Sequence, residues 1–170
     1  SWTQFLNPLF VVMFAPFFAY LWVFLGKRNL DPNMPVKFAI GLILMAIGFI
    51  VMIFAVKFAL VSSPVGVQWL LLTYLLHTFG ELTLSPVGLS AFSKYSPKKY
   101  LGQMMGIWFL ASSLGGVLAG LLGGEATQSG LQSMTPVFTN LVYYCLAIAG
   151  ILIGLSFFIK GVSEEKEDQK

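Results

Sequence analysis

His77-Thr-Phe-Gly-Glu-Leu-Thr-Leu-Ser-Pro-Val-Gly-Leu-Ser90 places ionisable side chains inside an otherwise apolar stretch. The stretch runs from about residue 68 to residue 93, and roughly 26 residues rising 1.5 Å each are enough for a helix to cross a bilayer. Glu81 falls near its middle. A carboxyl group costs about 3 kcal/mol or more to insert there, so an acid at that depth is by default a functional residue facing protein or a water-filled cavity.

Four side chains of this segment lie four residues apart, which predicts that they share one stripe of a helix: His77, Glu81, Ser85 and Leu89. Pro86 cannot donate a backbone hydrogen bond to the carbonyl of Leu82, so we expect the helix to bend or open at that turn. An acid beside an interrupted helix indicates a binding site.

The composition indicates a membrane protein. Of the 170 residues, 57% are hydrophobic and only 10% are charged, which excludes an ordinary water-soluble globular domain. The net charge is +3. The Lys and Arg residues flank the apolar runs, where the positive-inside rule accounts for them, so no nucleic-acid partner is predicted.

Five apolar segments are each close to the length that a bilayer crossing needs. They predict an all-α membrane helix bundle, followed by a cytoplasmic tail at 161–170. The predicted spans are 1–26, 36–61, 68–93, 101–123 and 136–160.

Charge asymmetry predicts the orientation of the bundle. Nine of the ten Lys and Arg residues lie in alternate connections or in the tail, and Lys57 is the exception. By the positive-inside rule, the Ser1 end is expected outside and the Lys170 end in the cytoplasm. An odd number of spans starting outside predicts at least one preceding helix in a longer protein, and a six-helix unit would be a half of a major facilitator transporter.

The segment 101–123 carries two ladders of small residues at four-residue spacing, which predict close approach of another helix. Trp108 continues one ladder toward the cytoplasm, so its bulky ring either lines a cavity or anchors a helix interface. The ladders are Ser112, Gly116, Gly120 and Gly124, and Ala111, Gly115, Ala119 and Gly123.

Asn7 precedes Pro8 in the first span. Pro8 leaves the carbonyl of Gln4 without its helical donor, and the Asn7 amide can both donate and accept hydrogen bonds beside that gap. A buried Asn in a membrane either joins two helices or contacts a ligand.

Together with the segment 77–90, the sequence Met104-Met-Gly-Ile-Trp-Phe-Leu110 and the pair Asn7-Pro8 resemble the proton-coupled oligopeptide transporter (POT) family. The resemblance covers the whole chain and implies the last five helices of a twelve-helix major facilitator fold. It implies a symporter that imports di- and tripeptides by alternating access, with protons as the coupling ion, no other cofactor and no enzymatic activity. The expected location is the plasma (inner) membrane, with several spans and the C-terminus in the cytoplasm.

The resemblance also implies roles for six residues. Asn7 and Glu81 would hold the amino terminus of the peptide, with Ser85 nearby and Trp108 lining the cavity. Apart from the resemblance, the chemistry of an intramembrane acid makes Glu81 a candidate for proton coupling, since the substrate or an opposing cation can decide whether it holds a proton. The cytoplasmic gate would be closed by Leu89 and Met105. The other partners implied are an N-terminal half of the same transporter and the lipid bilayer.

Three alternatives remain open at the level of sequence. A carrier for a drug, nitrate or amino acid would share the fold. A metalloenzyme could use His77 and Glu81 on successive turns, although no third ligand accompanies them and no metal site is predicted. A non-transporting assembly subunit would leave Glu81 sealed in an ion pair.

Overall fold

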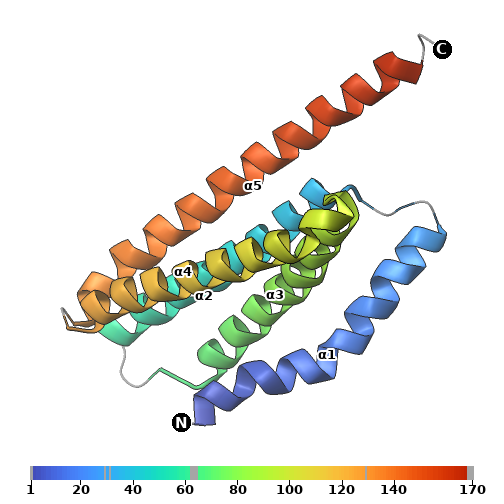
Figure 1. Ribbon diagram of the computed structural model, residues 1–170. Coiled ribbons are helices and arrows are strands. Elements are labelled where there is room, and N and C mark those ends of the chain that lie inside the picture. Colours follow the sequence, from blue (N-terminus) through green and yellow to red (C-terminus); the bar gives the residue numbers. More distant parts are fainter. Residues whose placement is uncertain (1, 29, 31, 62–64, 129, 168–170) are drawn as a thin grey trace.

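The structure is a computed structural model that describes residues 2–28, 30, 32–61, 65–128 and 130–167. All regular elements within these ranges are helical, so the all-α fold class is confirmed (Figure 1). A single 3-10 turn, η1 (Lys98–Tyr100), precedes the fourth helix. The α-helices are α1 (Trp2–Lys27), α2 (Met34–Val61), α3 (Gln68–Tyr95), α4 (Leu101–Gln128) and α5 (Leu131–Glu167).

Each expected apolar segment carries one of these helices, and the last two helices are longer than the apolar runs. α4 continues to Gln128. α5 begins at Leu131 and continues through 161–167, where the sequence predicts a tail. Pro136 lies inside α5. It is the sixth residue of the helix, just beyond the four positions whose N–H groups have no acceptor within the helix, so the carbonyl of Gln132 loses its helical donor while the helix stays continuous.

The helices alternate in direction along the chain. The α1–α2 and α3–α4 connections and the C-terminal end of α5 lie at one end of the molecule (Figure 1). The start of α1 and the other two connections lie at the opposite end. The basic connections therefore lie at the same end as the C-terminus, as the charge pattern requires.

Four of the described helices are long and apolar enough to cross a membrane: the segments Phe5–Lys27, Met34–Val61, Lys98–Gly124 and Gln132–Phe158. α3 does not reach the same level of hydropathy, although at 28 residues it is as long as α2. Its polar side chains, Glu81 and His77 among them, lower the average. The helix with the weakest membrane signal is thus the one that carries the candidate site.

α2 is the central helix, since it packs along α3 on one side and α5 on the other (Figure 1). Its contact with α3 is made by glycines. A β-carbon at Gly80 would lie 2.9 Å from the carbonyl oxygen of Gly41 and 2.8 Å from Cγ of Met45. The backbones of α2 and α3 therefore approach closely, which is the mode of packing that small residues permit between membrane helices.

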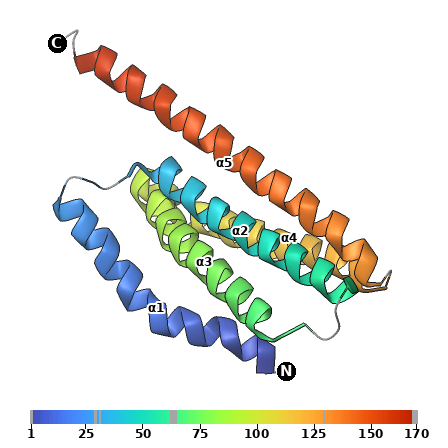
Figure 2. The same ribbon diagram turned by 180° about the vertical axis from the view of Figure 1, so that it is seen from behind.

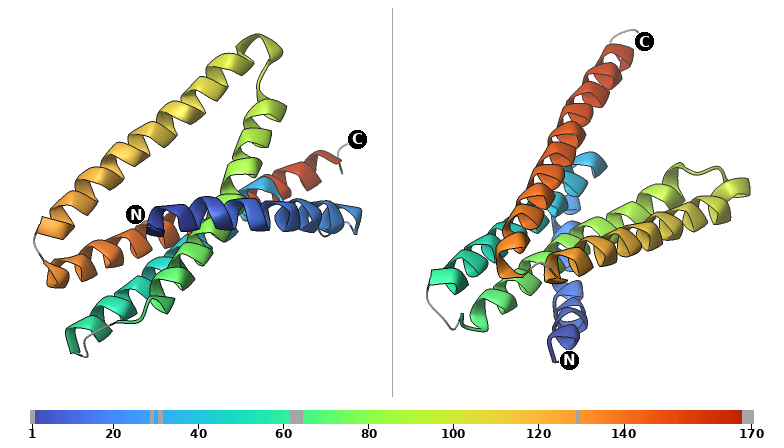
Figure 3. Two further views of the ribbon diagram at one scale, coloured as in Figure 1. Left: turned by 90° about the horizontal axis from the view of Figure 1, so that it is seen from below. Right: turned by 90° about the vertical axis from the view of Figure 1, so that its left-hand side faces the viewer.

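Among the described residues, the two small-residue ladders of α4 do not make such a contact. A β-carbon at Gly115, Gly116 or Gly120 would meet no described atom within 4 Å. The α4 backbone approaches only α3, α5 and η1 among the described elements, and Figure 3 shows it standing apart from the rest over most of its length. The expected close packing is found at the α2–α3 seam instead.

α1 packs across α3 (Figure 2). The contact includes aromatic side chains of both helices. The ring of Phe79 lies 5.0 Å from that of Phe14 and 5.3 Å from that of Phe18, measured between ring centroids. α1 is visibly bent, and it contains Pro8 and Pro16, each of which removes a backbone donor from the helix.

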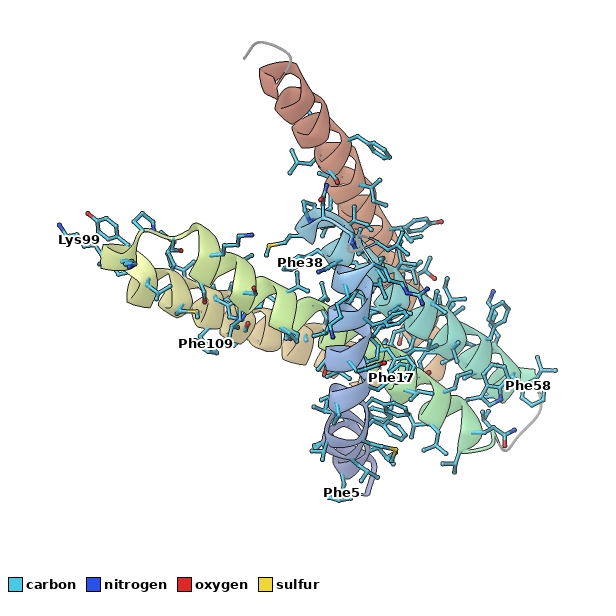
Figure 4. The ribbon with its side chains drawn as sticks, turned by 90° about the vertical axis from the view of Figure 1, so that its right-hand side faces the viewer. Phe5, Phe17, Phe38, Phe58, Lys99 and Phe109 are labelled. Atoms are coloured by element: carbon cyan, nitrogen blue, oxygen red, sulfur yellow. The ribbon has the colours of Figure 1, made fainter. Side chains whose placement is uncertain are left out.

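Large apolar side chains project from the outer surfaces of the helices. Figure 4 labels Phe5 and Phe17 on α1, Phe58 on α2 and Phe109 on α4, and all four are at least half exposed. Such a surface is typical of contact with lipid or with another part of a membrane protein, and in water it would promote aggregation.

Candidate functional site

α3 presents a different face to each of its three neighbours. His77, Gly80 and Leu84 face α2, where they meet Gly48, Gly41 and their surroundings. Thr78 and Glu81 are hydrogen-bonded to Asn7 of α1. Gly88 faces the indole of Trp108 on α4. These faces follow from the period of 3.6 residues per turn, which places side chains three or four positions apart on the same side of a helix.

The predicted stripe of four residues is therefore divided between neighbours. His77 turns toward α2, whereas Glu81 turns toward α1. A step of four residues rotates the side chain by about 40° beyond a full turn, and α1 crosses α3 at an angle, so successive members of the stripe meet different helices. α3 also stays helical through Pro86, so the turn does not open there, and a bend at that turn stays a prediction.

Asn7 and Glu81 come together as the resemblance implied. The amide nitrogen of Asn7 donates to both carboxylate oxygens of Glu81, at 3.3 Å to Oε1 and 3.2 Å to Oε2. Both side chains are half-buried. The first turns of α1 and the middle of α3 thus share a polar centre between two apolar helices.

Thr78 completes this polar centre. Its hydroxyl lies 3.1 Å from Oδ1 of Asn7 and 2.8 Å from the carbonyl oxygen of Tyr74. The side chain is 0% exposed. We did not predict a role for it, although a signal was present: a hydroxyl three residues before an intramembrane acid lies on the same helix face as the acid.

Trp108 lies at the seam between α3 and α4. A β-carbon at Gly88 would lie 2.6 Å from Cζ3 of the indole, so the missing side chain of Gly88 makes room for the ring. Phe38 of α2 meets the indole edge-on, with ring centroids 6.4 Å apart. Trp108 is half-buried. The sequence left two roles open for Trp108, at a helix interface or in the lining of a cavity. The structure shows an interface contact, and the cavity role stays a prediction.

The remaining predicted site residues are spread along the C-terminal half of α3 and the start of α4. Ser85 is exposed on the turn after Glu81, and Leu89 and Met105 are half-buried. Trp108 meets α3 at Gly88, seven residues beyond Glu81, which is about 10 Å along the helix axis. The structure therefore joins Asn7 to Glu81 directly and places Trp108 about two turns away.

His77 and Glu81 do not share a ligand-binding space. The His77 ring lies against Gly48 and meets Phe49 edge-on at 4.7 Å between centroids, while Glu81 is held by Asn7 on α1. Within the described part of the chain, no group of three or more His, Cys, Asp or Glu side chains could hold a metal ion. The geometry gives no support to the metalloenzyme alternative.

Comparison with known families agrees with this arrangement. A family model described as the POT family matches residues 1–137, which include Asn7, Glu81 and Trp108. The chain belongs to the POT family.

Two curated relatives of this POT-family chain are named as peptide transporters. A peptide transporter from Yersinia enterocolitica is 37% identical over 99% of this chain and 34% of its own length. A di-/tripeptide transporter from Lactococcus lactis subsp. cremoris is 34% identical over 94% of this chain and 30% of its own length. The chain therefore spans about a third of the length of these relatives.

A solved structure shows the same fold. The crystal structure of a peptide transporter POT in complex with sulfate superposes with a TM-score of 0.77 and 35% sequence identity. The match covers 91% of this chain and 30% of that protein. The five helices of this POT-family chain are thus arranged as in a known peptide transporter.

Proposed function

We propose that this chain is the C-terminal part of a proton-coupled symporter that imports di- and tripeptides by alternating access. The rest of the transporter would supply the other side of the substrate cavity. Family membership and the names of the relatives support this proposal. They do not favour a carrier for a drug, nitrate or amino acid.

The observation that carries the proposal is the pairing of Asn7 with Glu81. A peptide's terminal ammonium has three donors and a positive charge, so it needs an anion and further acceptors in a site sheltered from water. Glu81 offers a carboxylate, and its partner Asn7 is a neutral amide that leaves the charge uncompensated. A sealed ion pair, which a non-transporting subunit would show, is not the arrangement around Glu81 in the described residues.

The same carboxylate suits proton coupling. In our proposal, Glu81 pairs with the ammonium when it is ionised and releases it when it takes a proton, so that a proton and a peptide are handled by one group. Recognition of the peptide termini alone would leave the side chains in a roomy cavity that Ser85 and Trp108 border. Leu89 and Met105, on the cytoplasmic side of Glu81, would close the exit.

The proposed orientation follows from the basic residues. The end that holds the α1–α2 and α3–α4 connections and the C-terminus would face the cytoplasm, and the protein would lie in the plasma (inner) membrane. α3 would cross the membrane with the other four helices, because it is as long as α2 and packs along it.

The test is Glu81→Gln in the full-length transporter. Gln keeps the shape and the hydrogen-bonding capacity of the side chain but removes its charge and its titration. We expect weaker binding of dialanine in detergent, by about tenfold or more for a lost charge-assisted contact. N-acetyl-dialanine, which has no ammonium, should lose much less affinity. Uptake driven by a pH gradient into liposomes should fall.

Thermal melting and gel filtration of the same preparations serve as the control for folding. If Glu81→Gln binds dialanine as tightly as wild type and accumulates it equally under a pH gradient, Glu81 is a structural acid and the proposal is wrong.

A further inference from the structure

We propose that Thr78 is a positioning residue, whose buried hydroxyl sets the orientation of the Asn7 amide and so decides which of its two polar atoms faces Glu81. This inference rests on the proposed role of Asn7 and Glu81 in holding the peptide's amino terminus. It concerns a residue that touches neither the substrate nor the proton directly.

The three side chains form a continuous hydrogen-bonded relay between two helices. Thr78 donates to Oδ1 of Asn7 at 3.1 Å, and Nδ2 of Asn7 donates to Glu81 at 3.2 and 3.3 Å. The Thr78 hydroxyl also lies 2.8 Å from the carbonyl oxygen of Tyr74, one turn earlier in α3. It has one hydrogen and two acceptors within reach.

The choice between these acceptors determines the state of the relay. When Thr78 donates to Asn7, the amide oxygen of Asn7 is occupied and its nitrogen faces Glu81. An ionised carboxylate can only accept hydrogen bonds. This orientation therefore matches the ionised form of Glu81, which is the form that can hold an ammonium group.

The alternative choice matches the protonated form. When Thr78 donates to the carbonyl of Tyr74, its oxygen can accept from Nδ2 of Asn7. The amide is then turned by 180°, with the same heavy-atom positions, and its oxygen faces Glu81. A protonated carboxyl group can donate to that oxygen. Both states satisfy every group in the relay. The passage between them turns the Asn7 amide and the Thr78 hydroxyl, and its only net exchange with water is the proton that Glu81 takes up or returns.

Thr78 differs from the two other buried threonines of α3, Thr73 and Thr83, in having a second acceptor on another helix. Thr73 and Thr83 on α3 make the same bond to the backbone carbonyl four residues earlier, at 2.9 Å to Trp69 and 2.8 Å to Phe79. That bond is the ordinary way in which a membrane helix satisfies a threonine. Contact with a side chain on another helix is the feature that ordinary satisfaction does not explain.

Few other titratable groups lie near the relay. On α3, Tyr74 belongs to the preceding turns and His77 faces α2. On α1, Tyr20 and Lys27 are roughly 20 and 30 Å along the helix from Asn7. Lys37 and Lys57 are close to the two ends of α2, and residues 101–124 of α4 contain no titratable side chain. The protonation state that Asn7 responds to is therefore that of Glu81.

The experiment compares Thr78→Val with Thr83→Val in the full-length transporter. Valine has the shape of threonine without the hydroxyl. Thr83 is a matched control, because it is 1% exposed, lies on the same helix and makes the same backbone bond. We expect Thr78→Val to weaken dialanine binding about fivefold, the value of one hydrogen bond. Thr83→Val should change it less than about twofold.

Three further measurements separate positioning from packing. Thr78→Val should leave the binding of N-acetyl-dialanine within about twofold of wild type, because that ligand has no ammonium to pair with Glu81. Thr78→Ser, which retains the hydroxyl, should restore most of the affinity. In an Asn7→Ala background, Thr78→Val should have little further effect, since two residues of one network are not additive. Thr78→Ala serves as the second variant if Thr78→Val does not fold.

Equal losses in Thr78→Val and Thr83→Val, or an undiminished loss in the Asn7→Ala background, would overturn the inference. If wild-type protein binds neither peptide, the proposed function fails by itself. The inference is then decided by the melting temperatures of wild type, Thr78→Val, Asn7→Ala and the double variant. Non-additive shifts for the two substitutions support it, and additive shifts refute it.

Discussion

The imidazole ring of His77 occupies the space that a side chain at Gly48 would need. A β-carbon at Gly48 would lie 2.6 Å from Nε2 of His77, far inside van der Waals contact. Nε2 is buried and has no hydrogen-bond partner among the described residues. The α2–α3 seam therefore depends on a glycine that admits an aromatic ring, just as it depends on the backbone contact between Gly41 and Gly80.

Gly48→Ala should destabilise the protein, because the ring of His77 has packed neighbours on α2 and cannot move without cost. We expect a loss of about 1 to 3 kcal/mol, the range for overpacking a core. Thermal melting in detergent measures it. Gly102→Ala is the control, because a β-carbon there meets nothing within 4 Å; it should be neutral or slightly stabilising. An equally small effect of both substitutions would contradict the packing described here.

Trp108→Ala should lower the stability of the folded protein, whatever its effect on peptide binding, because the indole fills the space beside Gly88. We expect about 1 to 3 kcal/mol, less than for a fully buried Trp because the ring is half-buried. Gly88→Ala should also destabilise the wild-type protein, yet be nearly neutral once Trp108 is alanine. Additive losses in the double variant, measured by thermal melting, would show that the two positions do not meet.

Asn7→Ala should weaken the binding of free dipeptide about three- to tenfold, since it removes one hydrogen-bonding partner of Glu81. Asn140→Ala is a matched control, because Asn140 is an exposed asparagine on α5. Isothermal titration of dialanine compares the two. An equal loss of dialanine affinity in Asn140→Ala would mean that the effect of Asn7→Ala does not come from its contact with Glu81.

Cysteines introduced at Asn33 and Ser96 should react only with reagents applied from the cytoplasm. Both positions lie at the end of the molecule that carries most of the basic residues, and the positive-inside rule places that end in the cytoplasm. A cysteine at Ser129, which is outside the described residues, should react only from the exterior. Labelling of Ser96 from outside would reverse the proposed orientation.

Much of the fold could be predicted because membrane helices are encoded by the length of their apolar runs. The five helices and the meeting of Asn7 with Glu81 followed from run length and from the family resemblance. The division of the α3 stripe did not, because helix period gives the face of a residue but not the helix that covers it. The two α4 ladders show the same difficulty: their spacing predicts a close neighbour, and the close contact lies at Gly41 and Gly80 instead.

Thr78 was missed for a different reason. A threonine in a membrane helix normally bonds to its own backbone, so its presence carries little information in the sequence. Its importance depends on a contact with a helix 71 residues away, which spacing along α3 cannot reveal. A buried hydroxyl on the same face as an acid is therefore worth testing even when its local bond is satisfied.

The distance along the chain between Asn7 and its partners also matters while the protein is being made. Asn7 precedes Glu81 by 74 residues, and synthesis at about 5 to 20 residues per second separates the two by roughly 4 to 15 seconds. During that interval α1 enters the membrane before α3 exists. Its amide, and the carbonyl that Pro8 leaves unpaired, must then be satisfied by water, headgroups or the insertion machinery. The residue that would later hold a substrate thus makes insertion of the nascent α1 less favourable until α3 has been synthesised and can bond to it.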